Sequence, residues 1–561
     1  MIGWISDKTA VTATETTMAP AAPVETTPVA EVVEPTATTG LHLTTVVGDL
    51  DAVDALPRRE PVPVLRPALD RCLVTGVTLG TDTRVVMMRD SNGVADVLQE
   101  RLSGLGVTVL SLDPGKSIEQ IISTVDAWHS EGEIAGVYWL PALDDEGPLD
   151  SLTPAEWQEG LRRRVKALYA VMRRLYDDGA FLVAGTRLGG FHGYDAAGAT
   201  APMGGAVTGF AKSYKRERPE ALVKAVDSSL DAAPEEVADL LVAETNHDPG
   251  CVEVGYADGR RWGVGLAARP FPPPGATEEG TTSLGPDSVV VVTGAAGSIV
   301  AAVTADLARA AGGGTFHLLD LAPEPDPNDP DLRQYVEDRD GLKVVLATRM
   351  KEQGKRPTPV AIEKELTAFE RLASAMTAID AVQNAGGKAC YHSVDLTDPE
   401  AVARVMGEVR SSVDRIDLLV HAAGIEVSRA LPDKEPREFD LVHGVKADGW
   451  INVMNGVGGL PIGATVVFSS VAGRFGNAGQ CDYGAANDLL CKITSSMRRT
   501  QPETRAIAID WTAWGGIGMA TRGSIPKVME MAGVEMLPPA AGVAWIRREL
   551  IGHGFRGEVV V

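Results

Sequence analysis

Cysteine and long hydrophobic runs are scarce in this sequence. The spacing of its five cysteines fits neither a disulfide framework nor a zinc site. No apolar run is long enough to cross a bilayer, and no charged-then-apolar leader opens the chain. We therefore expect a protein of the reducing cytoplasm, with no metal site and no membrane partner.

Positive charge is also in short supply. The chain has 52 Lys and Arg against 76 Asp and Glu, a formal net charge of −24. Such a field repels a phosphate backbone, so nucleic acid is not an expected partner. Basic runs do occur at 162–164, 173–174 and 215–216. Most such runs are solvated helix faces, and the alternative is a docking patch for an acidic protein.

The length predicts more than one folded unit, because 561 residues exceed the usual size of a single core. Residues 1–45 are low-complexity Thr, Ala, Pro, Val and Glu, which predicts a disordered tether. A second linker, 269–286, contains a proline triplet. The predicted units are therefore 46–268 and 287–561.

Both units alternate short apolar runs with helical patterns. The clearest strands of the first unit are VVMMRD, VTVLSL, AGVYWLPAL and FLVAG. Those of the second are SVVVVTG, TFHLLDL, KACYHSVD, IDLLVHAAG, ATVVFSS and RAIAIDW. This alternation predicts an α/β fold with two doubly wound, Rossmann-like parallel sheets. In the second unit a helical insertion at about 322–387 interrupts it, with one long helix preceded by a shorter one around 331–353.

The first functional motif lies where the first strand of the second unit meets its first helix. Backbone N–H groups and a helix N-terminus at such a turn can hold a pyrophosphate. The candidate residues are Thr293, Gly294, Ala295, Ala296, Gly297, Ser298 and Ile299. The simpler interpretation is that small residues let the helix pack on the strand.

Two further strand ends carry candidate residues. His421, Ala422, Ala423 and Gly424 end one strand, where they would line the ribose and nicotinamide side of a dinucleotide, or merely form a tight turn. Ser470 ends another strand. Tyr483 opens a helix thirteen positions later, and Asn487 follows on the same helix face.

In these motifs the chain resembles the short-chain dehydrogenases, and among them the ketoreductase domains of type I polyketide synthases and polyunsaturated fatty acid synthases. The resemblance covers about 289–550 and rests on VVTGAAG, SVDLTD, HAAG, VKADGW, FSSVAG, YGAAN and DWTAWGGIGMA, in that order. The helical insertion and the string GKRPTP are more similar to the polyunsaturated fatty acid synthase type. In this family the first half is a structural, non-catalytic copy of the fold, and it lacks a Ser–Tyr pair here.

The resemblance implies a catalytic tetrad of Tyr483, Ser470, Lys446 and Asn487, and coenzyme contacts at Asp395 and Leu396. A free tyrosine has a pKa of about 10, so Lys446 would supply the charge that lowers the pKa of Tyr483. Ser470 and Tyr483 would hold the substrate carbonyl while hydride arrives, and Tyr483 would then donate a proton. The simpler interpretations are a half-buried tyrosine, a solvated lysine and a serine cap.

The coenzyme prediction depends on Asp320 and Leu321. Family members mostly use NADPH and have an arginine where this chain has Leu321. A carboxylate such as Asp320 can accept hydrogen bonds from both ribose hydroxyls of NADH but would repel the 2′-phosphate of NADPH, which favours NADH. Alternatively, Asp320 caps the following loop and Arg349, Lys351 or Lys355 of the insertion reaches the phosphate.

The function implied by the resemblance is reduction of a β-ketoacyl group carried on the phosphopantetheine arm of an acyl carrier protein, beside other synthase domains. A free-standing reductase of ketones or coenzyme A thioesters is the alternative within enzymes. An inactive reductase kept as a scaffold is the alternative outside them. Ser298 and Val300 stand where the family has glycine, a departure that bears on coenzyme affinity.

Overall fold

The computed structural model describes residues 43, 45–273, 276, 278–521, 525–531, 533 and 535–561. Nearly all of the predicted tether lies outside these residues. Leu43, near its end, is buried with Leu332 and Met376 of the insertion. Among the described helices, none is both long and apolar enough to cross a membrane.

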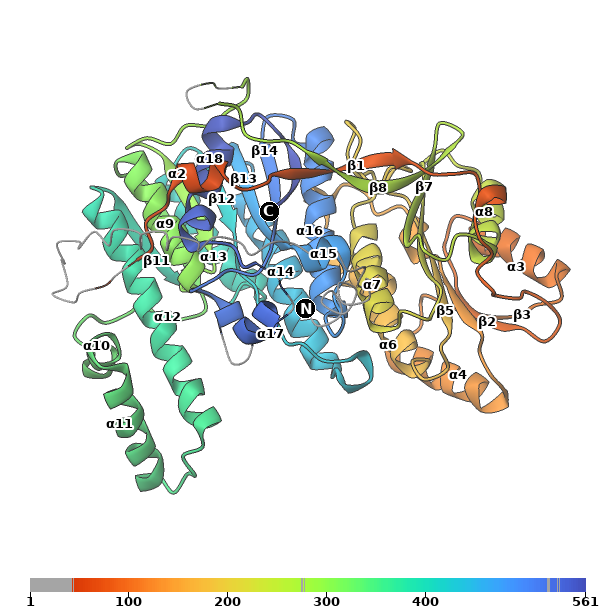
Figure 1. Cartoon of the computed structure of the whole chain (residues 1–561), viewed down its shortest axis with the longest axis horizontal. Coiled ribbons are helices and arrows are strands. Elements are labelled where there is room, and N and C mark those ends of the chain that lie inside the picture. Colours follow the sequence, from red (N-terminus) through yellow and green to blue (C-terminus); the bar gives the residue numbers. More distant parts are fainter. Residues whose placement is uncertain are drawn as a thin grey trace, which may run out of the picture.

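One 15-stranded sheet runs through the described part of the chain, in the order β11-β10-β9-β12-β13-β14-β15-β1-β8-β7-β6-β5-β4-β2-β3 (Figure 1). Its first-half strands are β1 (Arg59–Leu65), β2 (Arg84–Met88), β3 (Thr108–Leu112), β4 (Gly136–Trp139), β5 (Phe181–Thr186), β6 (Val223–Ser228), β7 (Glu253–Ala257) and β8 (Arg260–Ala268). Its second-half strands are β9 (Val289–Thr293), β10 (Thr315–Asp320), β11 (Lys388–Ser393), β12 (Ile416–His421), β13 (Ile462–Ser470), β14 (Arg505–Trp511) and β15 (Gly557–Val560).

The predicted α/β class is confirmed. The second half is entirely parallel, and its strand order is that of a dinucleotide-binding fold with one added strand. The first half begins with the order β3-β2-β4-β5-β6, the other common doubly wound arrangement, and ends in the antiparallel pair β7–β8.

The two halves share one sheet, whereas the sequence predicted two. Strand β1 pairs antiparallel with β8 along its whole length and with β15 at Arg59 and Val560. Because β1 meets β15 only at its first residue, most of it is an edge strand, where Pro61 and Pro63 are tolerated. One short strand thus joins the halves.

Helices cover both faces of the sheet. In the first half, α3 (Val94–Gly104) and α8 (Pro234–Asn246) pack on one face. The other face carries α4 (Ile118–Glu131), α5 (Pro154–Leu161), α6 (Ala167–Arg174) and α7 (Gly204–Glu217). In the second half, α9 (Ser298–Ala311), α12 (Pro359–Asn384) and α18 (Pro539–Gly552) cover one face. The opposite face of that half carries α13 (Pro399–Ser412), α14 (Pro436–Val457) and α16 (Cys481–Thr500).

Helix α2 (Leu50–Asp54) packs on the second half, although it precedes the first. The Asp49 N–H donates to the carbonyl of Ala540 over 3.0 Å, and Asp54 pairs with Arg548 of α18 at 2.7 Å. Helix α2, which lies in the predicted unit 46–268, therefore packs against the unit 287–561.

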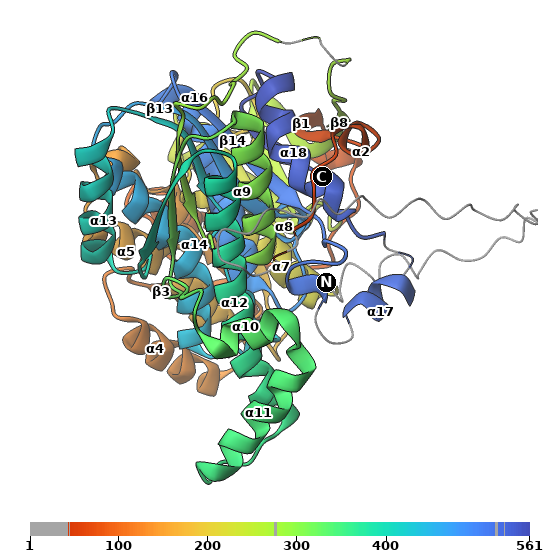
Figure 2. The ribbon, with the colours of Figure 1, turned by 90° about the vertical axis from the view of Figure 1, so that its left-hand side faces the viewer.

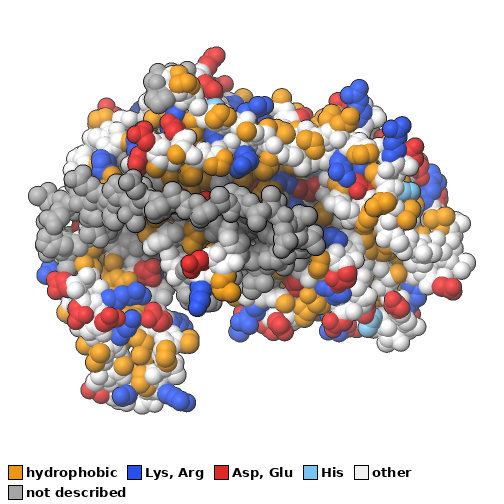
Figure 3. Space-filling model, viewed as in Figure 1, with side chains coloured by type: hydrophobic (Ala, Val, Ile, Leu, Met, Phe, Trp, Pro, Cys, Tyr) orange, Lys and Arg blue, Asp and Glu red, His pale blue; other side chains and the backbone are white. Residues whose placement is uncertain are grey.

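The insertion forms an arm of three helices, α10 (Pro330–Glu337), α11 (Arg339–Glu352) and α12. The predicted long helix is α12, which Thr358 caps and Pro359 begins. The predicted shorter helix is split into α10 and α11, because Asp338 leaves helical geometry and its side chain caps Gly341. The arm projects from the body and carries interspersed positive and negative side chains (Figures 2 and 3).

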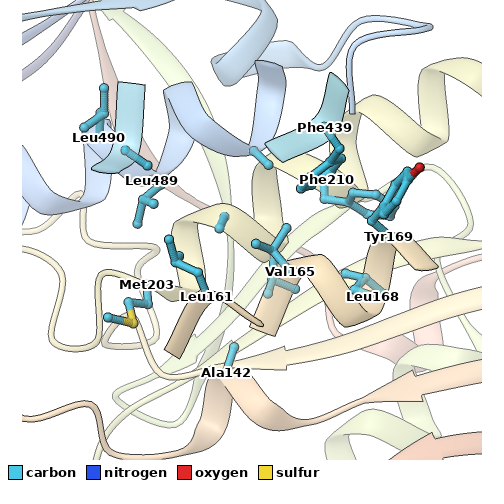
Figure 4. Close-up of a cluster of buried hydrophobic side chains, with 14 of the residues drawn as sticks. Ala142, Leu161, Val165, Leu168, Tyr169, Met203, Phe210, Phe439, Leu489 and Leu490 are labelled. Carbon is cyan, nitrogen blue, oxygen red and sulfur yellow. The ribbon is translucent and has the colours of Figure 1, made fainter. Parts of the chain in front are cut away.

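The two halves also share one hydrophobic core. Phe439 and Leu489 of the second half pack with Val165, Leu168 and Phe210 of the first (Figure 4). At its centre α7 packs on α16. Because apolar side chains of both halves belong to one cluster, separating the halves would expose buried apolar surface.

Most of the predicted basic runs are engaged in local ion pairs. Arg162 and Arg163 each contact Glu159 at 2.6 Å, and Arg174 contacts Asp126 at 2.5 Å. These pairs favour the interpretation of ordinary solvated faces over that of a docking patch.

Candidate active site

A cavity of about 700 Å³ opens at the carboxyl ends of the second-half strands. It lies where the strand order reverses between β9 and β12, the usual ligand position in such sheets. The predicted residues that line it are Gly294, Ala296, Gly297, Ser298, Ile299, Asp320, Leu321, Asp395, Leu396, Ala422, Ala423, Gly424, Lys446, Ser470 and Tyr483. Residues far apart in sequence thus meet at one site.

Glycine is required at the first turn of the cavity. Gly294 has φ of +74°, and a Cβ there would lie 2.8 Å from the Ala423 nitrogen. Only glycine combines that conformation with so close an approach. The turn leads directly into α9, whose first residues Ser298 and Ile299 line the cavity, so its N-terminal N–H groups are suited to a pyrophosphate.

Four predicted residues lie behind the wall instead of in it: Thr293, Ala295, His421 and Asn487. Ala295 is fully buried in the apolar core. The Thr293 hydroxyl accepts hydrogen bonds from the Ala422 and Ala423 N–H groups, at 3.2 and 3.3 Å. Thr293 therefore fixes the second loop of the cavity against the first.

His421 positions the lysine of the site. Burial lowers the pKa of His421 to about 3, so its ring is neutral. Its Nε2 lies 3.0 Å from the Lys446 carbonyl, which can only accept, so Nε2 carries the proton. Nδ1 then accepts from the Thr293 hydroxyl at 3.0 Å. These two partners determine the tautomer of the ring. The hydrogen bond from Nε2 to the Lys446 carbonyl holds the α14 backbone in place.

Ser470 and Tyr483 come from adjacent elements. Ser470 ends β13, and its hydroxyl accepts from the Ala472 N–H at 3.1 Å, capping the short helix α15 (Val471–Phe475). Tyr483 lies in the first turn of α16. Burial and, to a smaller extent, the nearby Glu426 raise the pKa of Tyr483 to about 12, while hydrogen bonds with Ser470 and Asn487 act in the opposite direction. The phenol is therefore protonated at neutral pH and can donate.

Lys446 lies beside Tyr483 without lowering its pKa, contrary to the sequence prediction. The Lys446 ammonium donates to the Phe468 carbonyl at 2.7 Å and lies 5.7 Å from the centre of the Tyr483 ring. Its own pKa is lowered to about 8 by burial. A Cβ on Gly424 would lie 2.8 Å from its Cε, so Gly424 makes room for the lysine chain.

Asn487 supports the tyrosine from one helical turn away. Its Nδ2 donates to the Tyr483 carbonyl at 2.7 Å, while its Oδ1 is buried and has no partner among the described residues. An unpaired buried acceptor beside a cavity fits a site that receives a polar ligand.

Sequence reasoning missed three charged residues of the cavity lining, Glu370, Glu426 and Arg371. Arg371 belongs to α12. It forms an ion pair with Asp320, which is 2% exposed. Asp320 also accepts from the Ala296 N–H at 3.0 Å and from the Ala322 N–H at 2.9 Å. Asp320 therefore caps the following loop, as the alternative expected. The three basic residues named for that alternative do not line the cavity, and Arg349 pairs with Asp331.

One cluster in the described part of the chain could in principle hold a metal ion. Ligand atoms of Cys491, Asp510 and Glu558 lie within 4.8 Å of one another. Cys491 contacts Ser469 at 3.1 Å, and Glu558 accepts from the Tyr194 hydroxyl at 3.0 Å. The cluster is thus hydrogen-bonded into the contact between the halves and lies outside the cavity lining.

The cavity suits a nicotinamide dinucleotide. A glycine turn and a helix N-terminus lie at the β9 end, the Asp320 carboxylate lies at the end of β10, and the Tyr483 phenol lies in the first turn of α16. Its volume is within the usual range for ligand sites.

Residues 288–516 match the model of a protein family described as the KR domain. Over 378 residues the chain is 28% identical to one component of the polyunsaturated fatty acid synthase of Thraustochytrium sp., a match that covers 65% of this chain and 13% of that protein. It is 25% identical over 212 residues to polyketide synthase PksN of Bacillus subtilis, covering 36% of this chain and 4% of that protein. The chain thus spans a small fraction of the length of these relatives.

Solved structures resemble both halves together. An N-terminal ketoreductase from the macrolactin assembly line has a TM-score of 0.65 at 15% identity, covering 91% of this chain and 93% of its own. A-type ketoreductases from a modular polyketide synthase give 0.63 at 19% identity, with the same coverage. Together with the family match, this shared fold supports the resemblance: residues 288–516 match the KR domain family, and the two halves together share the fold of ketoreductases from polyketide assembly lines.

Proposed function

We propose that this chain reduces a β-ketoacyl thioester, carried by an acyl carrier protein, to the β-hydroxyacyl thioester with NAD(P)H. One observation carries the proposal. Tyr483, Ser470 and Lys446 line the same cavity, and the glycine turn at Gly294 lines it as well. The synthases to which the chain is similar support a carrier-bound substrate and neighbouring synthase domains as partners. The five cysteines are all unpaired, which supports a reducing compartment such as the cytoplasm.

The tetrad residues have separate tasks in this reaction. The bound coenzyme supplies the hydride that reaches the β-carbonyl carbon. The Ser470 and Tyr483 hydroxyls donate hydrogen bonds to the carbonyl oxygen as it gains negative charge. Tyr483, kept protonated by burial, then transfers its proton to that oxygen and completes the alcohol. The Lys446 ammonium contributes positive charge to the cavity in which the carbonyl oxygen gains negative charge, and Asn487 holds the backbone of the tyrosine turn.

Two features bear on the choice of coenzyme. Asp320 at the end of β10 and Leu321 after it favour NADH, as the sequence predicted. The ion pair of Asp320 with Arg371 favours NADPH, because it reduces the negative charge that a 2′-phosphate would meet.

The substrate proposal is tested by comparing one β-ketoacyl group on a carrier protein with the same group on coenzyme A and on a short thiol. We expect the carrier-bound form to have the highest kcat/KM. Equal values would favour a free-standing reductase. If a generic ketone and every thioester fail to oxidise NADPH or NADH, the chain is an inactive scaffold.

Lys446 should set the alkaline limit of ketone reduction. Its pKa is lowered to about 8, and the ammonium is the form present below that pH, so kcat/KM should fall as pH rises through about 8. Lys446→Ala should lower kcat/KM by roughly 10- to 100-fold, as expected for a charged hydrogen-bonding group, and should abolish this limb. Pre-steady-state or steady-state pH–rate profiles of both proteins measure the effect. An unchanged profile in the variant would remove Lys446 from the tetrad.

A further inference from the structure

The arm reaches the coenzyme cavity through one face of α12. Thr367, Glu370 and Arg371 of this helix line the cavity, together with Asp320 and Leu321 at the end of β10. A segment that interrupts the dinucleotide fold in the sequence therefore completes the wall of its binding site.

The carboxylate of Asp320 already has three hydrogen-bond donors. It accepts hydrogen bonds from the Ala296 and Ala322 N–H groups and forms an ion pair with the Arg371 guanidinium. Its side chain is 1% exposed. Two backbone donors and one cation hold the negative charge inside the wall. For a ligand in the cavity, the positive charge of Arg371 therefore offsets the negative charge of Asp320.

Arg371 itself remains open to the cavity. Its side chain is 41% exposed, and the bond to Asp320 uses one of its terminal nitrogens. A guanidinium carries five N–H donors in a planar fork that matches phosphate oxygens. Glu370 opposes an anion at this end of the cavity and Leu321 has no charge, so a phosphate there depends on Arg371.

We propose that Arg371, contributed by the insertion, binds the 2′-phosphate of NADPH and sets the coenzyme preference of this chain. The proposal rests on the proposed NAD(P)H-dependent function and names the residue that selects between the two coenzymes. Arg371 acts twice: it neutralises Asp320, which would otherwise repel the phosphate, and it offers its remaining donors to the phosphate oxygens.

The test measures binding without turnover. Titration calorimetry gives Kd values for NADPH and NADH, and for 2′,5′-ADP against 5′-AMP, which differ in the 2′-phosphate and carry no nicotinamide. The proteins are the full chain and its Arg371→Ala and Arg371→Lys variants. Arg349→Ala is the matched control, because Arg349 is an exposed arginine of the same arm that pairs with Asp331 outside the cavity lining.

We expect the full chain to bind NADPH at least tenfold more tightly than NADH, and 2′,5′-ADP more tightly than 5′-AMP. Arg371→Ala should weaken NADPH and 2′,5′-ADP by roughly 10- to 100-fold, the usual cost of losing a charged hydrogen bond, and should leave NADH unchanged or tighter because Asp320 is released. Arg371→Lys should keep part of the preference, and Arg349→Ala should keep all of it.

Two results overturn the proposal: tighter binding of NADH than of NADPH by the full chain, or an equal loss of both coenzymes in Arg371→Ala. Melting curves of each variant separate a lost contact from a lost fold. Failure of the proposed reductase function would appear differently, as normal selective binding without reduction of any ketone or thioester.

Discussion

Replacing Tyr483 by phenylalanine is expected to lower kcat at least about 100-fold, the minimum typical of a positioned general acid. The substitution removes the proton donor and one hydrogen bond to the carbonyl oxygen, and it keeps the ring that packs in the first turn of α16. Coenzyme affinity should change little, because the phenol lies at the α16 side of the cavity, away from the glycine turn. Single-turnover kinetics and coenzyme titration measure the two effects separately.

A matched substitution tests whether the effect is specific. Tyr335 of α10 packs against Phe369 within the arm and does not line the cavity. Tyr335→Phe should therefore retain wild-type kcat. If Tyr483→Phe keeps more than about a tenth of the wild-type kcat, another group donates the proton and the assignment of Tyr483 is wrong.

The elements that could be predicted from the sequence are those whose signals are local. Strand β9 is an unbroken valine run that ends in a glycine turn, and α12 begins at a Thr–Pro cap. The order of motifs also singles out Tyr483 and Ser470, which both line the cavity. Each of these signals lies within a few residues of the feature that it predicts.

The features that the sequence did not predict depend on contacts between distant segments. Arg371 lies 51 residues after Asp320 in the inserted segment, and no periodicity indicates that α12 lies over the end of β10. Strand β1 joins the two halves of the sheet although its prolines make it a poor strand by pattern. The Tyr483 pKa was misjudged for a similar reason, because burial and the direction of the Lys446 ammonium are properties of the packed site.

The crossing of α7 and α16 links the first half of the chain to Tyr483. A Cβ on Gly209 would lie 2.3 Å from the Gly484 carbonyl oxygen, and one on Gly205 would lie 2.8 Å from the Asp488 carbonyl oxygen. The helices therefore run antiparallel, with their backbones in direct contact at these glycines. Gly484 directly follows Tyr483, so the crossing positions the catalytic helix turn from the other half of the chain.

Gly209→Ala should therefore impair both stability and turnover, although residue 209 lies outside the KR domain. The added methyl group meets backbone that cannot rotate away, so α7 and α16 must separate, at a cost of about 1–3 kcal/mol in the free energy of unfolding. Thermal melting should show a fall in Tm of several degrees, and kcat should fall because the Tyr483 turn moves.

The matched control is Gly407→Ala, in the middle of α13. There the nearest atom to a new Cβ is 3.8 Å away, at the end of the Arg410 side chain, so the substitution should be neutral or stabilising by up to about 1 kcal/mol through helix propensity. If Gly209→Ala lowers Tm and kcat more than Gly407→Ala does, the loss comes from the contact between α7 and α16. It does not come from adding a methyl group to a helix in general. Wild-type Tm and kcat in Gly209→Ala would show that the two helices have room to separate, and that the first half does not hold Tyr483 in place.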